Sequence, residues 1–461
     1  MRHAVLLIAN AIVLSGTQAR AQSLPPSNPL QDAIGAPANF TLRGTFRTRI
    51  EGIDGQFRPA PAPRDDMLLS FRTTLFAEYD AHDVRIGAEL IDSRGYFERP
   101  QSTRGTTEIN AFELGQAYLA FDLAGLFGSG AKSSITIGRF TQDVGSRRLI
   151  GRNQFRNTIN AFTGVALDWQ SAAKDTLRLF WTMPHTRLPT EPDRIRDNAV
   201  MLDRESADLQ FFGGSFTKAG VLGGTLEVYG YGLNERDSAR YPTRNRRLFI
   251  PGMRVARAAK PDTFDYDLEG VYQTGTARAT AAPSDRTDLD VSAYFLHAEI
   301  GRTFKATWLP RIAIQYDRAS GDGSSAGKFN RFDTLFGVRR GEFGPTSLYG
   351  AVQRANLSSP AVRLEVTPVK PWDGFVAYRA LWLDTATDSF AATGIRDRAG
   401  KSGKFAGHQI EARARYWVIR NLARFDGGVA YLFKSRFLKD APNAPDAGNT
   451  RYVYLDLNFI L

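Results

Sequence analysis

Alternation of apolar and polar residues, with a period of two over segments of about ten residues, is the feature that most constrains this fold. Between Phe40 and Ile50 the even positions are mostly apolar, whereas the odd positions carry only threonine and arginine. Successive side chains of a β-strand point to opposite faces, so such a segment has one apolar and one polar face. The pattern recurs in residues 69–79, 264–273, 311–317 and 409–416, with a polar face that is cationic, acidic or mixed.

Three features favour a closed membrane barrel over a soluble sandwich. Segments of about ten residues are roughly twice as long as strands of soluble proteins. Tight turns, as at Asp80–Asp83 and Arg420–Leu422, alternate with long polar loops, as at 191–205 and 234–262, and barrels have this asymmetry between short periplasmic turns and long extracellular loops. The final residues also alternate up to Leu461, as in a terminal strand that guides barrel insertion.

The candidate strands number eighteen. They are centred near residues 40, 70, 85, 116, 136, 166, 179, 211, 228, 268, 296, 313, 349, 364, 379, 412, 428 and 456. Sixteen strands remain an alternative, because the segments around Ile135, Tyr349 and Ala377 are ambiguous in face and bacterial barrels have even numbers. We therefore expect an all-β protein, a closed antiparallel transmembrane β-barrel of about 18 strands that occupies residues 39–461 as one unit.

The N-terminus has the features of an export signal. Residues 1–21 contain Arg2, an apolar stretch and an A-x-A cleavage site at Ala19–Ala21, and the apolar stretch is too short to span a bilayer. We expect residues 22–38 to form a flexible lead-in to the barrel. The protein would then reside in the outer membrane of a Gram-negative bacterium.

Composition excludes several classes of protein. The chain has 43% hydrophobic residues and no later run of about 20 apolar residues, so it cannot form a bundle of membrane helices. It has no cysteine, which excludes disulfides and thiolate metal sites. The formal net charge is +11. For an exported chain, this charge indicates lipopolysaccharide, anionic polysaccharides or small acids as partners rather than nucleic acid.

Arginines on the polar faces are the candidate functional residues. A ladder of guanidinium groups can replace the hydration of an acidic solute by bidentate, charge-assisted hydrogen bonds, while acidic neighbours weaken binding enough to permit release. The alternative is that these charges pair across neighbouring strands and only stabilise a wet interior. The conduit arginines expected from the pattern are Arg43, Arg47, Arg72, Arg363, Arg413 and Arg415.

Five dispersed segments resemble the alginate export family of outer-membrane barrels. They are GRFTQDVGSRRLIG (138–151), FDYDLEGVYQTG (264–275), DRASGD (317–322), FNRFDTLFGVRRGEFGP (329–345) and GHQIEARARYWV (407–418). The resemblance implies an eighteen-stranded, monomeric pore that passes an anionic exopolysaccharide through an electropositive conduit, with possible partners in periplasmic export machinery. It also places further residues in that conduit: Arg139, Arg147, Arg148, Glu269, Gln273, Asp317, Asp322, Glu411, Arg413 and Arg415. The Arg339–Arg340 pair and the terminal Leu461 depart from the family pattern.

Other functions have less support. The five histidines are scattered, and no nucleophile elbow, H-E-x-x-H motif or P-loop is visible, so we expect no enzyme activity. The acidic turn Ser320–Gly323 resembles a calcium loop, but an ordinary turn is the simpler interpretation, and we expect neither a metal nor a cofactor. We expect the segment 329–345 to fold inward rather than lie against lipopolysaccharide. Two functions remain: passive export of an anionic polysaccharide or related acidic solute, and uptake of small nutrients by a porin.

Overall fold

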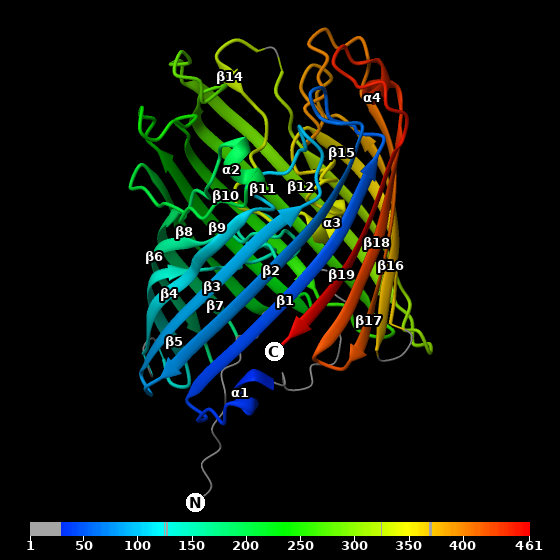
Figure 1. Ribbon diagram of the computed structural model, residues 1–461. Helices are drawn as coiled ribbons and strands as arrows, with labels where there is room; N and C mark the ends of the chain where they lie inside the picture. Colours follow the sequence, from blue (N-terminus) through cyan, green and yellow to red (C-terminus); the bar gives the residue numbers. More distant parts are fainter. Residues whose placement is uncertain (1–28, 124, 126–127, 324, 368–370) are drawn as a thin grey trace, which may run out of the picture.

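Eighteen tilted strands form the wall of a β-barrel (Figure 1). The structure is a computed structural model that describes residues 29–123, 125, 128–323, 325–367 and 371–461. The wall strands are β1 (Phe40–Asp54), β2 (Asp65–Asp80), β3 (Val84–Tyr96), β4 (Asn110–Asp122), β5 (Lys132–Phe140), β6 (Phe162–Gln170), β7 (Thr176–Pro184), β8 (Leu209–Val221), β9 (Gly224–Glu235), β10 (Arg247–Arg257), β11 (Phe264–Ala277), β12 (Leu289–Thr303), β13 (Arg311–Ala319), β15 (Leu357–Val366), β16 (Trp372–Trp382), β17 (Phe405–Ile419), β18 (Ala423–Lys434) and β19 (Thr450–Ile460).

The sheet closes because its first and last strands pair. β1 is antiparallel to both β2 and β19, with Phe46 opposite Thr73 on one side and Phe459 on the other. A further two-residue strand, β14 (Lys328–Phe329), pairs parallel to β12 and does not contribute to the wall circuit, because β13 pairs directly with β15. The predicted closed antiparallel barrel of about 18 strands is therefore confirmed.

The predicted number of wall strands was right, but two segments were assigned wrongly, one as a loop and one as a strand. The segment 234–262 is not one long loop, because it contains β10. Pro251 lies in the middle of this strand, and Leu248 and Ile250 make its inner face apolar, so the strand shows neither clear alternation nor strand-like composition. Conversely, the expected strand near Tyr349 lies in the inward-folded connection between β13 and β15.

The two ends of the barrel differ. Short connections, including those at Asp80–Val84 and Ile419–Ala423, lie at the end that also carries the short helix α1 (Pro29–Ala33) and the C-terminus (Figure 1). Long connections start from the opposite end and contain α2 (Pro192–Arg196), α3 (Arg340–Phe343) and α4 (Arg436–Asp440), of which α3 lies within the barrel (Figure 1). The expected signal peptide, residues 1–21, and the first residues of the lead-in, 22–28, lie outside the described residues. Among the described residues, no helix is long and apolar enough to cross a bilayer.

The outer face of the strands is apolar and exposed. In β13 buried and exposed residues alternate without exception, and the outward residues include Ile312 and Ile314. Ile314 is 68% exposed, whereas the neighbouring Gln315 is 3% exposed. A face of large apolar side chains on every second residue is expected where strands contact lipid.

A charged residue on this face should destabilise the barrel. We expect Ile314→Arg to lower the free energy of unfolding in lipid vesicles by about 2–4 kcal/mol, because the guanidinium would enter hydrocarbon. Urea titration of the refolded protein measures this change. Thr287→Arg, in the exposed connection between β11 and β12, is the control and should have no measurable effect. Equal stability of the two variants would contradict a lipid-facing position for Ile314.

Two long connections fold into the barrel and pack a core there. They are the β5–β6 loop (residues 141–161) and the β13–β15 loop (residues 320–356, with 324 not described). Phe336 of the second loop contacts Phe162 and Phe211 of the wall, with ring centroids 5.4 and 5.2 Å apart. The two loops also bind each other through backbone hydrogen bonds, including Phe336 N to Leu149 O (3.0 Å). The segment 329–345 thus folds inward, as expected, and part of the interior is apolar.

Candidate solute conduit

Strand alternation places the expected wall residues in the interior. Arg47 and Arg72 are buried there on β1 and β2, and Glu269 and Glu411 on β11 and β17. Arg43 shares the inner face of β1 but is exposed near the end with short connections. Further expected residues that face inward are Gln273, Arg139, Asp317, Arg363, Arg413 and Arg415.

Four of the expected arginines are ion-paired with carboxylates of the wall. The shortest nitrogen–oxygen distances are 2.9 Å for Arg139–Glu113, 2.6 Å for Arg363–Glu365, 3.2 Å for Arg413–Asp426 and 2.7 Å for Arg415–Asp373. Each positive charge therefore has a negative neighbour on the same or an adjacent strand. Arg139, Arg413 and Arg415 thus have the cross-strand pairing that was the alternative to a solute ladder, and Arg363 pairs within its own strand.

Arg47 and Arg72 differ from these four arginines, because neither has a carboxylate within 4.0 Å in the described part of the chain. Arg47 donates to the carbonyl oxygens of Gln154, Phe155 and Arg156 and to Asn157 Oδ1, at 3.0–3.2 Å. Arg72 donates to the carbonyls of Gln154 and Arg156 at 3.0 and 3.1 Å. These arginines hold the tip of the β5–β6 loop with neutral acceptors, so their positive charge is not cancelled.

Arg148 connects both inward loops to the wall. From the β5–β6 loop it reaches Asp267 (3.0 Å) and Glu269 (2.5 Å) on β11, and Glu342 (2.6 Å) on α3 of the other loop. Burial raises the pKa of Glu342, but the positive charges of Arg148 and Arg354 outweigh burial and hold that pKa at about 2. Glu342 therefore carries its negative charge at any physiological pH. The family resemblance placed Arg148 in the interior, but its three partners were not foreseen.

An aromatic contact fixes the same two loops near β1. The Phe155 ring of the β5–β6 loop lies between two guanidinium groups, with Arg49 3.9 Å and Arg340 4.7 Å from its centroid. Arg49 is itself paired with Asp456 at 2.5 Å, and Arg340 with Glu411. Burial lowers the pKa of Arg340, but the Glu411 charge more than offsets this effect, so the pKa is raised. Cation–π contacts in a desolvated site add to the ion pairs.

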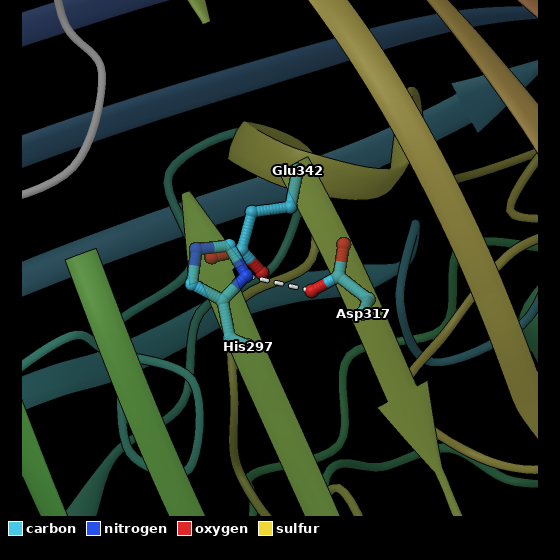
Figure 2. Close-up of side chains that lie close together, drawn as sticks. All are labelled: His297, Asp317 and Glu342. Atoms are coloured by element: carbon cyan, nitrogen blue, oxygen red, sulfur yellow. Dashed lines mark hydrogen bonds and ion pairs between the residues drawn. The ribbon is translucent and has the colours of Figure 1, made fainter. Parts of the chain in front are cut away.

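His297, Asp317 and Glu342 form a cluster that has the residue types of a metal site (Figure 2). The carboxylate oxygens, however, already have cationic or imidazole partners. Asp317 accepts from His297 Nδ1 at 2.7 Å and from Arg379 at 2.8 Å, and Glu342 binds Arg148 and Arg354. A divalent cation would have to displace three arginines and lie among their positive charges. We therefore interpret the cluster as part of the charge network that attaches α3 to the wall.

Several arginines of the loops have no ion pair among the described residues. Arg58, Arg156, Arg187 and Arg339 belong to this group and bind carbonyl and amide oxygens instead. The pKa of Arg156 is lowered well below its usual range. Burial is the largest cause, and the positive charges of Arg187 and Arg339 add to it. Burial and Arg354 lower the pKa of Arg339 to about 10. Period-two alternation could not find these residues because they lie outside the strands; the basic segment 329–345 was the one available signal.

Comparison with known proteins agrees with this architecture. The sequence profile described as Alginate export matches residues 39–448, which is nearly the whole barrel. The chain belongs to the alginate export family. No curated protein matches the sequence significantly.

Solved structures of other bacterial channels share the fold. Pseudomonas aeruginosa OpdK with vanillate has a TM-score of 0.58 at 12% identity, covering 92% of this chain and 98% of that chain. P. aeruginosa OccK2 (OpdF) in complex with glucuronate has a TM-score of 0.55 at 12% identity, covering 92% and 96%. P. aeruginosa OccD3 (OpdP) has a TM-score of 0.52 at 13% identity, covering 92% and 91%. Family and fold together identify this alginate-export-family protein as an outer-membrane β-barrel channel.

Proposed function

We propose that the protein passes an anionic polysaccharide or a related acidic solute by passive diffusion through its arginine-rich interior. The observation that carries this proposal is a group of interior and loop arginines that have no carboxylate partner within 4.0 Å in the described residues. The group includes Arg47, Arg58, Arg72, Arg156, Arg187 and Arg339. Positive charge that no carboxylate neighbours in the interior attracts anions and repels cations.

Passive diffusion also agrees with the rest of the charge distribution. Arg139, Arg363, Arg413 and Arg415 of the wall are paired with carboxylates, which limits the depth of any single anion site and permits release. No step of this transport requires a catalytic group, a metal or a cofactor. We further propose that the channel is a monomer in outer-membrane lipid and lipopolysaccharide, and that a polymer would reach it from periplasmic export machinery.

Uptake of small nutrients is the second candidate function. The β5–β6 and β13–β15 loops occupy the interior and bind each other and the wall, which favours a small solute over a polymer chain. Two channels of the same fold carry vanillate and glucuronate in their structures, and both of these compounds are carboxylates. Both candidate functions thus involve an acidic solute. They differ in whether that solute is a polymer or a small molecule.

Planar-bilayer recordings test the proposal. Under a KCl gradient we expect a reversal potential displaced towards that of chloride, because the unpaired arginines favour anions. Addition of oligomers of a uronic acid should block the current at lower concentration than monomeric glucuronate does if the polymer is the solute, whereas comparable block indicates small acids. A reversal potential on the potassium side would contradict an anion conduit of either kind.

A further inference from the structure

Carboxylates bridge two arginines at several places in this barrel. Asp267 lies between Arg148 and Arg254, with nitrogen–oxygen distances of 3.0 and 2.7 Å. Glu342 in the same way bridges Arg148 and Arg354. Each such bridge cancels charge where two cations would otherwise repel each other.

Arg156 and Arg187 are bridged by a neutral side chain instead. The Oδ1 atom of Asn160 accepts from Arg156 at 2.7 Å and from Arg187 at 2.8 Å. The amide orientation is fixed, because Asn160 Nδ2 donates to the carbonyls of Gly151 (2.8 Å) and Phe336 (3.0 Å). Asn160 has the hydrogen-bond geometry of a bridging carboxylate oxygen without its charge, and neither guanidinium has a carboxylate within 4.0 Å in the described residues.

A second pair of guanidinium groups lies beside the first. Arg58 and Arg339 both approach Gly350, where an added Cβ would lie 3.6 Å from a terminal nitrogen of Arg58 and 3.9 Å from one of Arg339. The positive charge of Arg339 also lowers the pKa of Arg156, which shows that the two pairs are close enough to repel each other electrostatically. Two carboxylates lie near this group. Glu108 is near all four arginines and accepts from Gly105 N and Thr107 Oγ1 in its own turn, and Asp203 is near Arg187 and accepts from Leu188 N and Asn110 Nδ2.

We propose that Arg156 and Arg187, which Asn160 bridges and Arg58 and Arg339 flank, form a binding site, here called the station, for the carboxylate group of a passing solute. This inference rests on the proposed function, because it assigns the anion preference to one place in the conduit. The carboxylate binds the donors of the two bridged guanidinium groups that Asn160 leaves unused, and the buried, unpartnered Nε of Arg156 is one such donor. Asn160 determines specificity, because an aspartate in its place would supply the missing anion internally.

Block of single-channel current by glucuronate, with glucose as the neutral probe, tests the station. We expect the double variant Arg156→Gln/Arg187→Gln to raise the half-blocking concentration of glucuronate at least about tenfold, because it removes two charge-assisted hydrogen-bond donors. The matched control Arg236→Gln/Arg286→Gln loses the same charge from exposed positions of the long loops. Its half-blocking concentration of glucuronate should equal that of the unaltered protein. Asn160→Asp should weaken block to a similar degree while every arginine stays in place.

The outcomes distinguish this inference from the proposed function. If the unaltered channel is not anion-selective, the proposed function fails and the station fails with it. If the channel is anion-selective but the double variant is blocked by glucuronate as before, or if glucuronate does not block the unaltered channel, the station alone is overturned. Asn160→Asp also removes two hydrogen bonds to carbonyls, so the double variant, in which glutamine can still donate to Asn160, decides the matter if Asn160→Asp does not fold.

Discussion

Arg148→Ala is expected to detach both inward loops from the wall while the barrel itself stays folded. Removal of this one guanidinium takes away the arginine partner of Glu269. Asp267 and Glu342 each lose one of their two arginine partners. Loss of one partner from a buried ion pair costs about 3–5 kcal/mol, because the other charge is left buried. The wall strands keep their backbone ladders, so this cost falls on the loops.

Hydrogen exchange at the amides that join the two loops measures the effect. Phe336 N and Val338 N donate to the β5–β6 loop, and both should exchange much faster in Arg148→Ala, with larger current fluctuations in planar bilayers. Arg236→Ala is the matched control, because it breaks an ion pair whose arginine is 78% exposed, and such pairs contribute little. Unchanged protection of Phe336 and Val338 in the Arg148 variant would show that packing alone holds the loops.

Replacement of residues 334–354 by a short glycine–serine linker is expected to raise single-channel conductance severalfold. This segment carries Phe336, Arg340, Glu342 and Tyr349 into the interior, and barrels of this strand number leave a wide aqueous channel unless loops fill it. Anion selectivity should fall at the same time, because Arg339 is lost and a wider, wetter conduit screens the remaining charges.

The control for the loop replacement is the same linker in place of residues 279–288. That connection between β11 and β12 is mostly exposed, so its removal should leave conductance and reversal potential unchanged. Both proteins should resist unfolding by SDS at room temperature if the barrel has closed. Equal conductance of the two variants would mean that the β13–β15 loop does not obstruct the path of ions.

The prediction of the wall from sequence succeeded where side chains face lipid on one side and the polar interior on the other. In β13 the alternation of Ile312 and Ile314 with Gln315 is sufficient to predict the strand and its two faces. Lipid and the polar interior impose opposite requirements on successive residues. It failed for β10, where Pro251 and an apolar inner face at Leu248 and Ile250 remove that contrast. The apolar inner surface exists because the inward loops pack against it, and no pattern within one strand indicates which loop will do so.

Sequence by itself determined that the chain has two-faced strands, an excess of basic residues and no means of forming a helical membrane bundle, since each of these properties is local or compositional. Tertiary structure decided which arginines keep their charge uncompensated. Arg363 and Arg413 fit the pattern of a solute ladder as well as Arg47 does, yet each has a carboxylate partner and Arg47 has none within 4.0 Å among the described residues. The physical reason is that compensation depends on distances of a few ångströms between groups far apart in the chain, such as Arg148 and Glu342.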